Sequence, residues 1–186
     1  MKRVFIAFVL IYCTSLIAQD RLIDRYSIGI NYQQTQLVGG DANIYNLHFE
    51  KQIPGSVTFG VDAFLHVGDT RKGTRSIYKS ISNFYFGGPT IYYSNAVIGM
   101  LYYRASLNAH VGTIKYRDVL QDAQHDVIIE EEGLYYGVFA RLEALAMISS
   151  NMQFNVGLGF MKGFTTSGDV ELNTSSTYQV GINFLL

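Results

Sequence analysis

Hydrophobic and polar residues alternate along most of the chain, and residues 96–112 show the pattern most clearly. Val97, Leu101 and Leu107 share one parity with other apolar residues, whereas the opposite parity becomes polar from Arg104 onward. Because successive side chains of a strand point to opposite faces, we expect one strand with an apolar face and a polar face. Its 17 residues exceed the usual soluble strand, which has roughly five or six.

The same alternation recurs in seven further stretches. It predicts strands at 25–34, 43–52, 56–67, 80–93, 132–145, 151–162 and 175–186, and it extends the strand from residue 96 to Tyr116. Residues 141–148 also suit a helix by propensity, but the alternation continues through them and favours a strand. Gly87-Gly88-Pro89 interrupts the fourth strand. Since proline cannot donate a hydrogen bond to a β-ladder, we expect a bulge there, at which inward and outward positions can exchange. Which residues of 80–93 face the lumen is therefore left open.

The predicted connections alternate in length. Short ones follow strands two, four and six, at 53–55, 94–95 and 147–150, and longer ones follow strands one, three, five and seven, at 35–42, 68–79, 117–131 and 163–174. Tight periplasmic turns opposite longer external loops are typical of membrane barrels. We therefore predict an all-β fold, a closed eight-stranded antiparallel up-and-down transmembrane β-barrel formed by residues 19–186.

The polar parity distinguishes this barrel from a soluble periplasmic lipid-binding barrel, which would point its apolar residues inward. A solvent-facing wall would be rich in lysine and glutamate, whereas these positions are mostly Gly, Ser, Asn, Gln and Thr. Such residues suit a narrow lumen. Tyr26, Tyr45 and Tyr178 lie toward strand ends, as in the aromatic girdles of membrane barrels. The membrane barrel is favoured, and the soluble barrel is the fallback.

Residues 1–18 are predicted to be a secretory signal peptide, because the basic start MKR precedes nine apolar residues, too few for a spanning helix. The single cysteine, Cys13, lies in this segment, which leaves the mature chain without disulfide or thiolate chemistry. Without Lys2 and Arg3, 12 of the 14 basic residues remain against 15 acidic ones. This balance excludes a basic nucleic-acid-binding surface.

The signal ending LIAQ, the eight alternating strands and the closing segment TYQVGINFLL resemble the small eight-stranded outer-membrane proteins. These are the OmpA/OmpX-type barrels, and in particular the outer membrane protein β-barrel domain of Bacteroidota-like bacteria. The resemblance implies location in the bacterial outer membrane, contact with its lipids and lipopolysaccharide, and insertion by the barrel-assembly machinery. Family members usually end on an aromatic residue, whereas Phe184 is followed here by two leucines.

Five charged residues fall on the inward parity at similar heights in the predicted barrel. They are Glu50, Asp62, Arg104, Arg141 and Glu143, with His48 close by. Buried charges are costly unless they are paired, and the planar arginine fork suits carboxylates. We expect the two arginines to bridge the three carboxylates and close the lumen. An ion-conducting or gating role is the alternative.

A second polar set is expected toward the outer end, where His66 and His110 face inward. Histidine beside aspartate can serve acid–base or metal chemistry, and some eight-stranded outer-membrane barrels transfer acyl groups. No serine nucleophile or deacylase or palmitoyl-transferase motif is identified, so we predict no catalytic residue, metal or cofactor. In the adjacent loop, Arg71, Lys72 and Arg75 are candidates for contact with anionic lipid phosphates.

The sequence thus predicts an integral outer-membrane β-barrel with a plugged polar lumen. Its expected role is structural, adhesive or in envelope interactions, without catalysis. A lipid-modifying acyl-transfer enzyme and a narrow channel are the alternatives.

Overall fold

The computed structural model describes residues 25–35, 42–72, 77–98, 100–121, 126–166 and 174–186, with only the backbone described at 69–72, 77–81, 118–121 and 126–129. They form the strands β1 (Arg25–Thr35), β2 (Ala42–Gln52), β3 (Ser56–Lys72), β4 (Ile77–Ile98), β5 (Leu101–Gln121), β6 (Asp126–Ser149), β7 (Met152–Thr165) and β8 (Ser175–Leu185). In this part of the chain no helix is long and apolar enough to cross a membrane. The predicted signal peptide lies outside the described residues.

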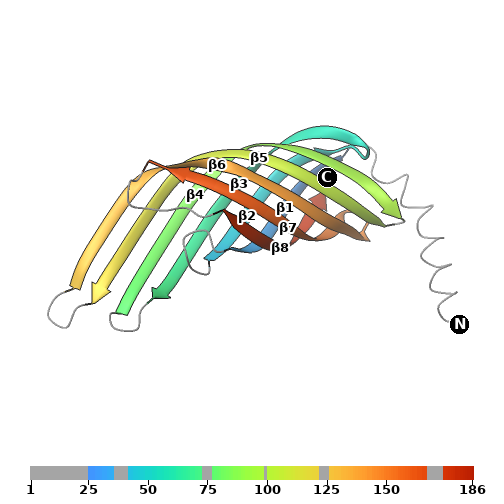
Figure 1. The fold of residues 1–186 in the computed structure, drawn as a ribbon. Coiled ribbons are helices and arrows are strands. Elements are labelled where there is room, and N and C mark those ends of the chain that lie inside the picture. The colour runs from blue at the N-terminus through green and yellow to red at the C-terminus, as the bar shows by residue number, and fades with distance from the viewer. Residues whose placement is uncertain (1–24, 36–41, 73–76, 99, 122–125, 167–173) are drawn as a thin grey trace, which may run out of the picture.

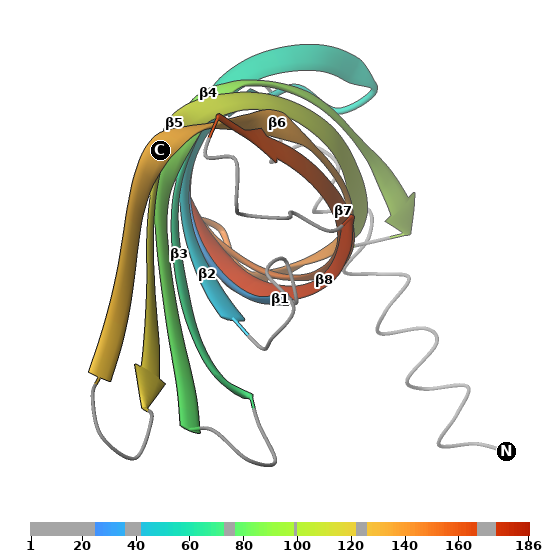
Figure 2. The ribbon, with the colours of Figure 1, turned by 60° about the vertical axis from the view of Figure 1, so that its left-hand side comes forward.

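The strands close into an antiparallel barrel in which each strand pairs with its sequence neighbours. β1 and β8 close the ring along a register that runs from Ser27↔Leu185 to Gln34↔Tyr178. Figure 2 shows this ring, in which β1 and β8 lie side by side. The predicted all-β, eight-stranded up-and-down barrel is therefore confirmed.

Side chains alternate between the lumen and the outer surface. Along β8, buried and exposed residues follow a strict two-residue period. Large apolar side chains cover the outside, for example Phe59 at 71% exposure, Phe160 at 64% and Leu142 at 59%. A slip of one residue in any pairing would move this apolar set into the polar lumen. The contrast between the two faces therefore fixes the register of the barrel.

The predicted single strand at 96–112 is wrong at its beginning. β4 continues to Ile98 and β5 begins at Leu101, so the chain reverses direction between these residues. The predicted turn at 94–95 lies within β4. The reversal was missed because it falls in the apolar run AVIGML, which lacks the usual polar turn residues. From Leu101 onward the predicted facing is found, with Arg104 buried in the lumen.

The bulge expected at Gly87-Gly88-Pro89 is also wrong. Pairing of β4 with β3 runs through Val61↔Pro89 without a register shift. Phe86 and Thr90, on either side of this segment, are both buried, so the inward parity does not change. Proline is accommodated because the β4–β5 backbone pairs are interrupted there and then resume in the same register.

Four consecutive strands, β3 to β6, are longer than the other four. β1, β2 and β8 have 11 residues each and β7 has 14, whereas β3 has 17, β4 22, β5 21 and β6 24. The long strands continue past the ring as a sheet, the protruding sheet, seen at the lower left of Figure 1. We call this end of the barrel the sheet end. The opposite end, which carries the short connections and both barrel termini, is the turn end.

The predicted long loops at 68–79 and 117–131 are thus mostly strand. The β3–β4 ladder reaches Lys72↔Tyr78, and the β5–β6 ladder reaches Gln121↔Asp126. Charged and polar residues are frequent in both segments, as in solvent-exposed loops, so the alternation of apolar and polar residues did not identify them as strands. The predicted loops at 35–42 and 163–174 fall largely outside the described residues.

Candidate functional site

An ion network crosses the lumen between opposite walls of the barrel. Arg104 on β5 is fully buried, and its Nε and Nη2 donate to Oε2 and Oε1 of Glu143 on β6 at 2.6 and 2.7 Å. Its Nη1 donates to Glu50 on β2, across the lumen. Gln52 donates a 2.9 Å hydrogen bond to Glu50, and Gln179 donates to Glu143. Both carboxylates are therefore bound from several sides.

The second arginine completes this network. Nη2 of Arg141 donates to Oδ2 of Asp62 at 2.5 Å, and its Nε donates to Ser106 at 2.9 Å. Asp62 also accepts hydrogen bonds from Thr90 at 2.6 Å and from the Tyr92 hydroxyl at 2.8 Å. The centroid of the Tyr92 ring lies 5.5 Å from Cζ of Arg104 and 5.8 Å from Cζ of Arg141. The structure thus places all five predicted lumen charges in one network.

The neutral members of the network were not identified from the sequence. They are Asn46, Gln52, Thr90, Tyr92, Ser106, Asn108 and Gln179. All occupy inward positions, so parity within the predicted strands could have found them, except in 80–93, whose facing was open. His48, expected close by, has its Nε2 3.3 Å from Nη1 of Arg104.

Asn108 fills a gap in the β4–β5 ladder. Its Nδ2 lies 3.1 Å from the Gly88 carbonyl oxygen and 3.2 Å from that of Pro89, where direct backbone pairing is interrupted. The same amide nitrogen donates to Thr90 Oγ1 at 2.7 Å, and its oxygen lies 3.0 Å from Nδ1 of His110. One side chain therefore connects the interrupted ladder with the ion network.

Replacing Asn108 with leucine, which has a similar size, is expected to lower the free energy of unfolding by about 1–3 kcal/mol, because it leaves buried acceptors without a donor. Urea unfolding in detergent, followed by the gel shift between folded and unfolded barrel, measures this change. Asn83→Leu, on the outer face of the same ladder, is the matched control and should change stability little. Equal stability of the two variants would contradict the role of Asn108.

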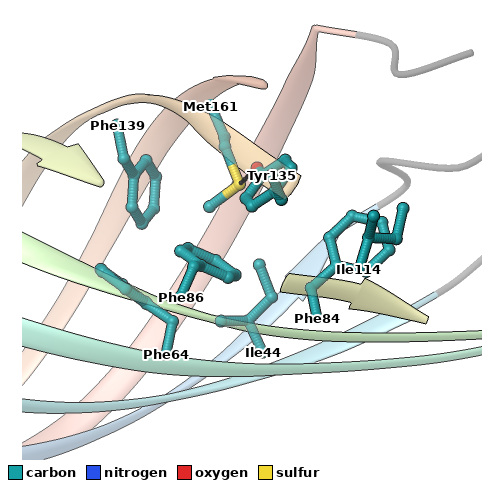
Figure 3. Close-up of a cluster of buried hydrophobic side chains, with 8 residues drawn as sticks. All are labelled: Ile44, Phe64, Phe84, Phe86, Ile114, Tyr135, Phe139 and Met161. Atoms are coloured by element: carbon teal, nitrogen blue, oxygen red, sulfur yellow. Dashed lines mark hydrogen bonds between the residues drawn. The ribbon is translucent and has the colours of Figure 1, made fainter. Parts of the chain in front are cut away.

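An aromatic layer fills the lumen toward the sheet end (Figure 3). It consists of Ile44, Phe64, Phe84, Phe86, Ile114, Tyr135, Phe139 and Met161, all buried. Phe64 stacks on Phe86 with ring centroids 4.7 Å apart, and the rings of Phe86 and Tyr135 meet edge to face at 5.0 Å. The sequence predicted a plugged polar lumen, and this aromatic layer is a second feature that sequence reasoning missed.

The two predicted lumen histidines lie within this aromatic layer. The ring of His66 stacks on that of Phe84 with centroids 4.5 Å apart. The centroid of the His110 ring lies 4.7 Å from that of Phe86 and 5.2 Å from that of Tyr135. Among the described residues neither imidazole is hydrogen-bonded to a hydroxyl group that could act as a nucleophile.

Other predicted contacts fall where side chains are not described. Arg71 and Lys72 have only their backbone described and Arg75 lies outside the described residues, so their contact with lipid phosphates stays a prediction. Within the described ranges, no three His, Cys, Asp or Glu residues are grouped to hold a metal ion.

No family model and no curated protein matches this sequence. Solved structures do: the chain is similar to a major outer membrane protein from Thermus thermophilus, at 12% identity and a TM-score of 0.52 over 87% of this chain and 99% of that one. It also matches Ail, the attachment invasion locus protein of Yersinia pestis, at 11% identity and a TM-score of 0.48, over 88% of this chain and 97% of that one. A third match is Neisserial surface protein A, at 10% identity and a TM-score of 0.47, over 87% of this chain and 96% of that one. In fold, the chain is a small eight-stranded outer-membrane β-barrel.

Proposed function

We propose that this protein is a non-catalytic integral outer-membrane barrel that presents its protruding sheet as an interaction surface outside the cell. The observation that carries this proposal is the unequal length of the strands. β6 has 24 residues, whereas β7 and β8, which follow it around the ring, have 14 and 11. At roughly 3.3 Å per residue, such a difference amounts to tens of ångströms of sheet beyond the ring.

The orientation follows from the connections. Both barrel termini lie at the turn end, where β2–β3 and β6–β7 are joined by short turns. In outer-membrane barrels the short turns face the periplasm and the longer segments face outward. The protruding sheet would therefore stand on the cell surface.

The protruding sheet has features of a binding surface. Its outer face carries two cross-strand ion pairs, Lys115–Glu132 at 2.6 Å and Arg117–Glu130 at 3.3 Å. The Glu132 carboxylate accepts a hydrogen bond from Lys115 and raises the pKa of that exposed amine. Such paired charges keep the face hydrated and limit its aggregation. A hydrated, charged face suits a polar protein or glycan partner.

One edge of this sheet lies along β6, beyond the described ladder with β7. The β6–β7 ladder begins at Tyr135↔Thr165, and a further backbone bond joins Thr166 to Leu134. β6 continues beyond this point to Asp126, paired there with β5. An edge of this kind can add a strand from a partner protein.

Closure of the lumen supports a role for the exterior rather than for a pore. In the ion network, Arg104 and Arg141 are both paired with buried carboxylates. The aromatic layer fills the part of the lumen toward the sheet end. The lumen of an eight-stranded barrel is only wide enough for side chains. We therefore propose that the lumen is plugged, as the sequence predicted, and that the protein does not conduct ions.

Replacing residues 69–80 and 116–130 with short turns tests the surface role. The shortened barrel should still show a heat-modifiable gel shift, because the residues of the ion network and of the aromatic layer lie outside the replaced segments. Bacteria producing it should lose adhesion to plates coated with extracellular-matrix protein or serum, relative to the full-length protein. A variant in which only residues 36–41 are replaced is the control. Unchanged adhesion of the shortened barrel would contradict the proposal.

A further inference from the structure

A group of exposed apolar side chains lies at the turn end of the barrel, where β4 joins β5. Its members are Val97, Ile98, Met100, Leu101 and Ile148, each between 41% and 63% exposed. Backbone pairing holds them together, because Ile98 lies opposite Leu101 in the β4–β5 ladder. On the other side, the amide of Met147 donates to the Met100 carbonyl oxygen at 2.9 Å, which joins the connection to β6. We call this group the apolar tip.

The other two connections at the turn end have ordinary turn residues. Pro54-Gly55 lies between β2 and β3, and Ser150-Asn151 lies between β6 and β7. In contrast, the β4–β5 connection has no polar residue from Ala96 to Leu101, and the chain carries no charged residue between Lys79 and Arg104. Exposed apolar groups that gather on one surface mark a contact with a protein or with a membrane.

The apolar tip continues the membrane-facing surface of the barrel. Leu101 shares the outward face of β5 with Leu107, and Ile148 shares the outward face of β6 with Leu142. The tip is therefore an extension of the apolar belt. Next to it on the outer face, the ring centroids of Tyr93 and Tyr103 lie 6.0 Å apart. Because tyrosine favours the boundary between bilayer and water, this pair indicates that the membrane surface lies close to the tip.

The backbone at the tip is protected on its open side. The last β3–β4 pair is Ser56↔Ser94, where the Ser94 carbonyl accepts from the Gly55 amide at 2.7 Å. Every second residue of a strand faces the same neighbour, so Ala96 is the next to face the β3 side. Its amide donates to Oδ1 of Asn95 at 2.8 Å. An unpaired amide is costly among lipids, and here the donor that a further strand would need is already used. The edge therefore favours lipid over a paired strand.

We propose that the apolar tip inserts into the periplasmic leaflet of the outer membrane and anchors β4, β5 and β6 to phospholipid. The apolar tip suits the acyl chains, while Asn95 and the tyrosine pair suit the headgroup region. The same three strands carry the protruding sheet at the other end, so the anchor would hold the base of that sheet in the membrane. The choice of leaflet rests on the orientation proposed above, whereas the lipid contact of the turn end does not.

Fluorescence quenching tests the lipid contact. Cys13 is the only cysteine of the chain, so Cys13→Ser combined with Ile98→Cys provides a single site for labelling with bimane. In liposomes, phosphatidylcholine with a nitroxide near the glycerol end of its acyl chain should quench this label severalfold more strongly than iodide present on both sides of the membrane. Ser150→Cys, in the polar β6–β7 turn at the same end, is the matched control and should show the opposite preference.

The outcomes are distinguishable. Heat-modifiable migration shows that each labelled protein is folded, and Val97→Cys provides a second site in the tip if Ile98→Cys does not fold. Iodide quenching as strong as that at position 150 would place the tip in water and overturn the proposal. Shielding from both quenchers would place it against protein, such as a second copy of this chain, and would also overturn it. Lipid quenching together with unchanged adhesion of the shortened barrel would support the anchor and contradict only the surface role of the protruding sheet.

Discussion

Replacing Arg104 with methionine is expected to lower the free energy of unfolding by about 3–5 kcal/mol, the cost of breaking a buried ion pair by removing one partner. The change leaves Glu50 and Glu143 buried without their shared cation. Urea unfolding of the protein in detergent, followed by the gel shift, measures the loss. Lys115→Met, which breaks an exposed ion pair on the protruding sheet, is the matched control and should change stability little.

A rescue variant distinguishes lost charge balance from lost packing. Adding Glu50→Gln and Glu143→Gln to Arg104→Met keeps the side-chain volumes and removes both orphaned charges. Most of the lost stability should return, because a buried ion pair replaced by neutral groups of similar volume is often tolerated. If the triple variant were as unstable as Arg104→Met alone, the loss would come from packing and the charge argument would be wrong.

Replacing Leu107 with arginine is expected to destabilise the barrel in a lipid bilayer by about 2–4 kcal/mol, the cost of a cation near the membrane midplane. Leu107 points outward, is 52% exposed and lies between the outward apolar residues Leu101 and Val111 of β5. Guanidinium unfolding from liposomes measures the change.

Thr113→Arg, six residues further along the same outer face, is the matched control. It lies where the outer face of β5 becomes polar, next to Lys115 on the same face. An arginine near the interface costs only about 0–1 kcal/mol. Equal losses for the two variants would contradict the placement of the apolar belt in the bilayer.

Much of the barrel could be predicted because inward and outward positions differ chemically. Arg104 and Glu143 lie on the inward parity of their strands, and parity alone placed them in the lumen. The turn before Leu101 was misplaced because its residues are as apolar as the strands that it joins. Residues 117–131 of β5 and β6 were assigned to a loop because charged residues such as Arg117 and Glu130 occupy both strands in pairs, which only the register reveals.

The partners within the lumen were harder to predict than the residues themselves. Parity shows that Glu50 and Arg104 face inward, but their contact depends on how far each strand is shifted around the ring. The same holds for Asn108, whose role becomes visible only when it lies opposite the interrupted pairs near Pro89. The aromatic layer was missed because Phe84 and Phe86 lie in the strand whose facing was left open.

The pairing of β1 with β8 has a consequence for biogenesis. Ser27 and Leu185 lie in the first and the last strand of the barrel and become neighbours only when the ring closes. Contacts between such distant segments form slowly, because a long loop must be closed before they contribute. Until the last strand arrives, the first and the penultimate strands each have an unpaired edge, which is prone to wrong pairing. Ring closure is therefore the step at which a chaperone or an insertion catalyst would have the greatest effect on the yield of folded protein.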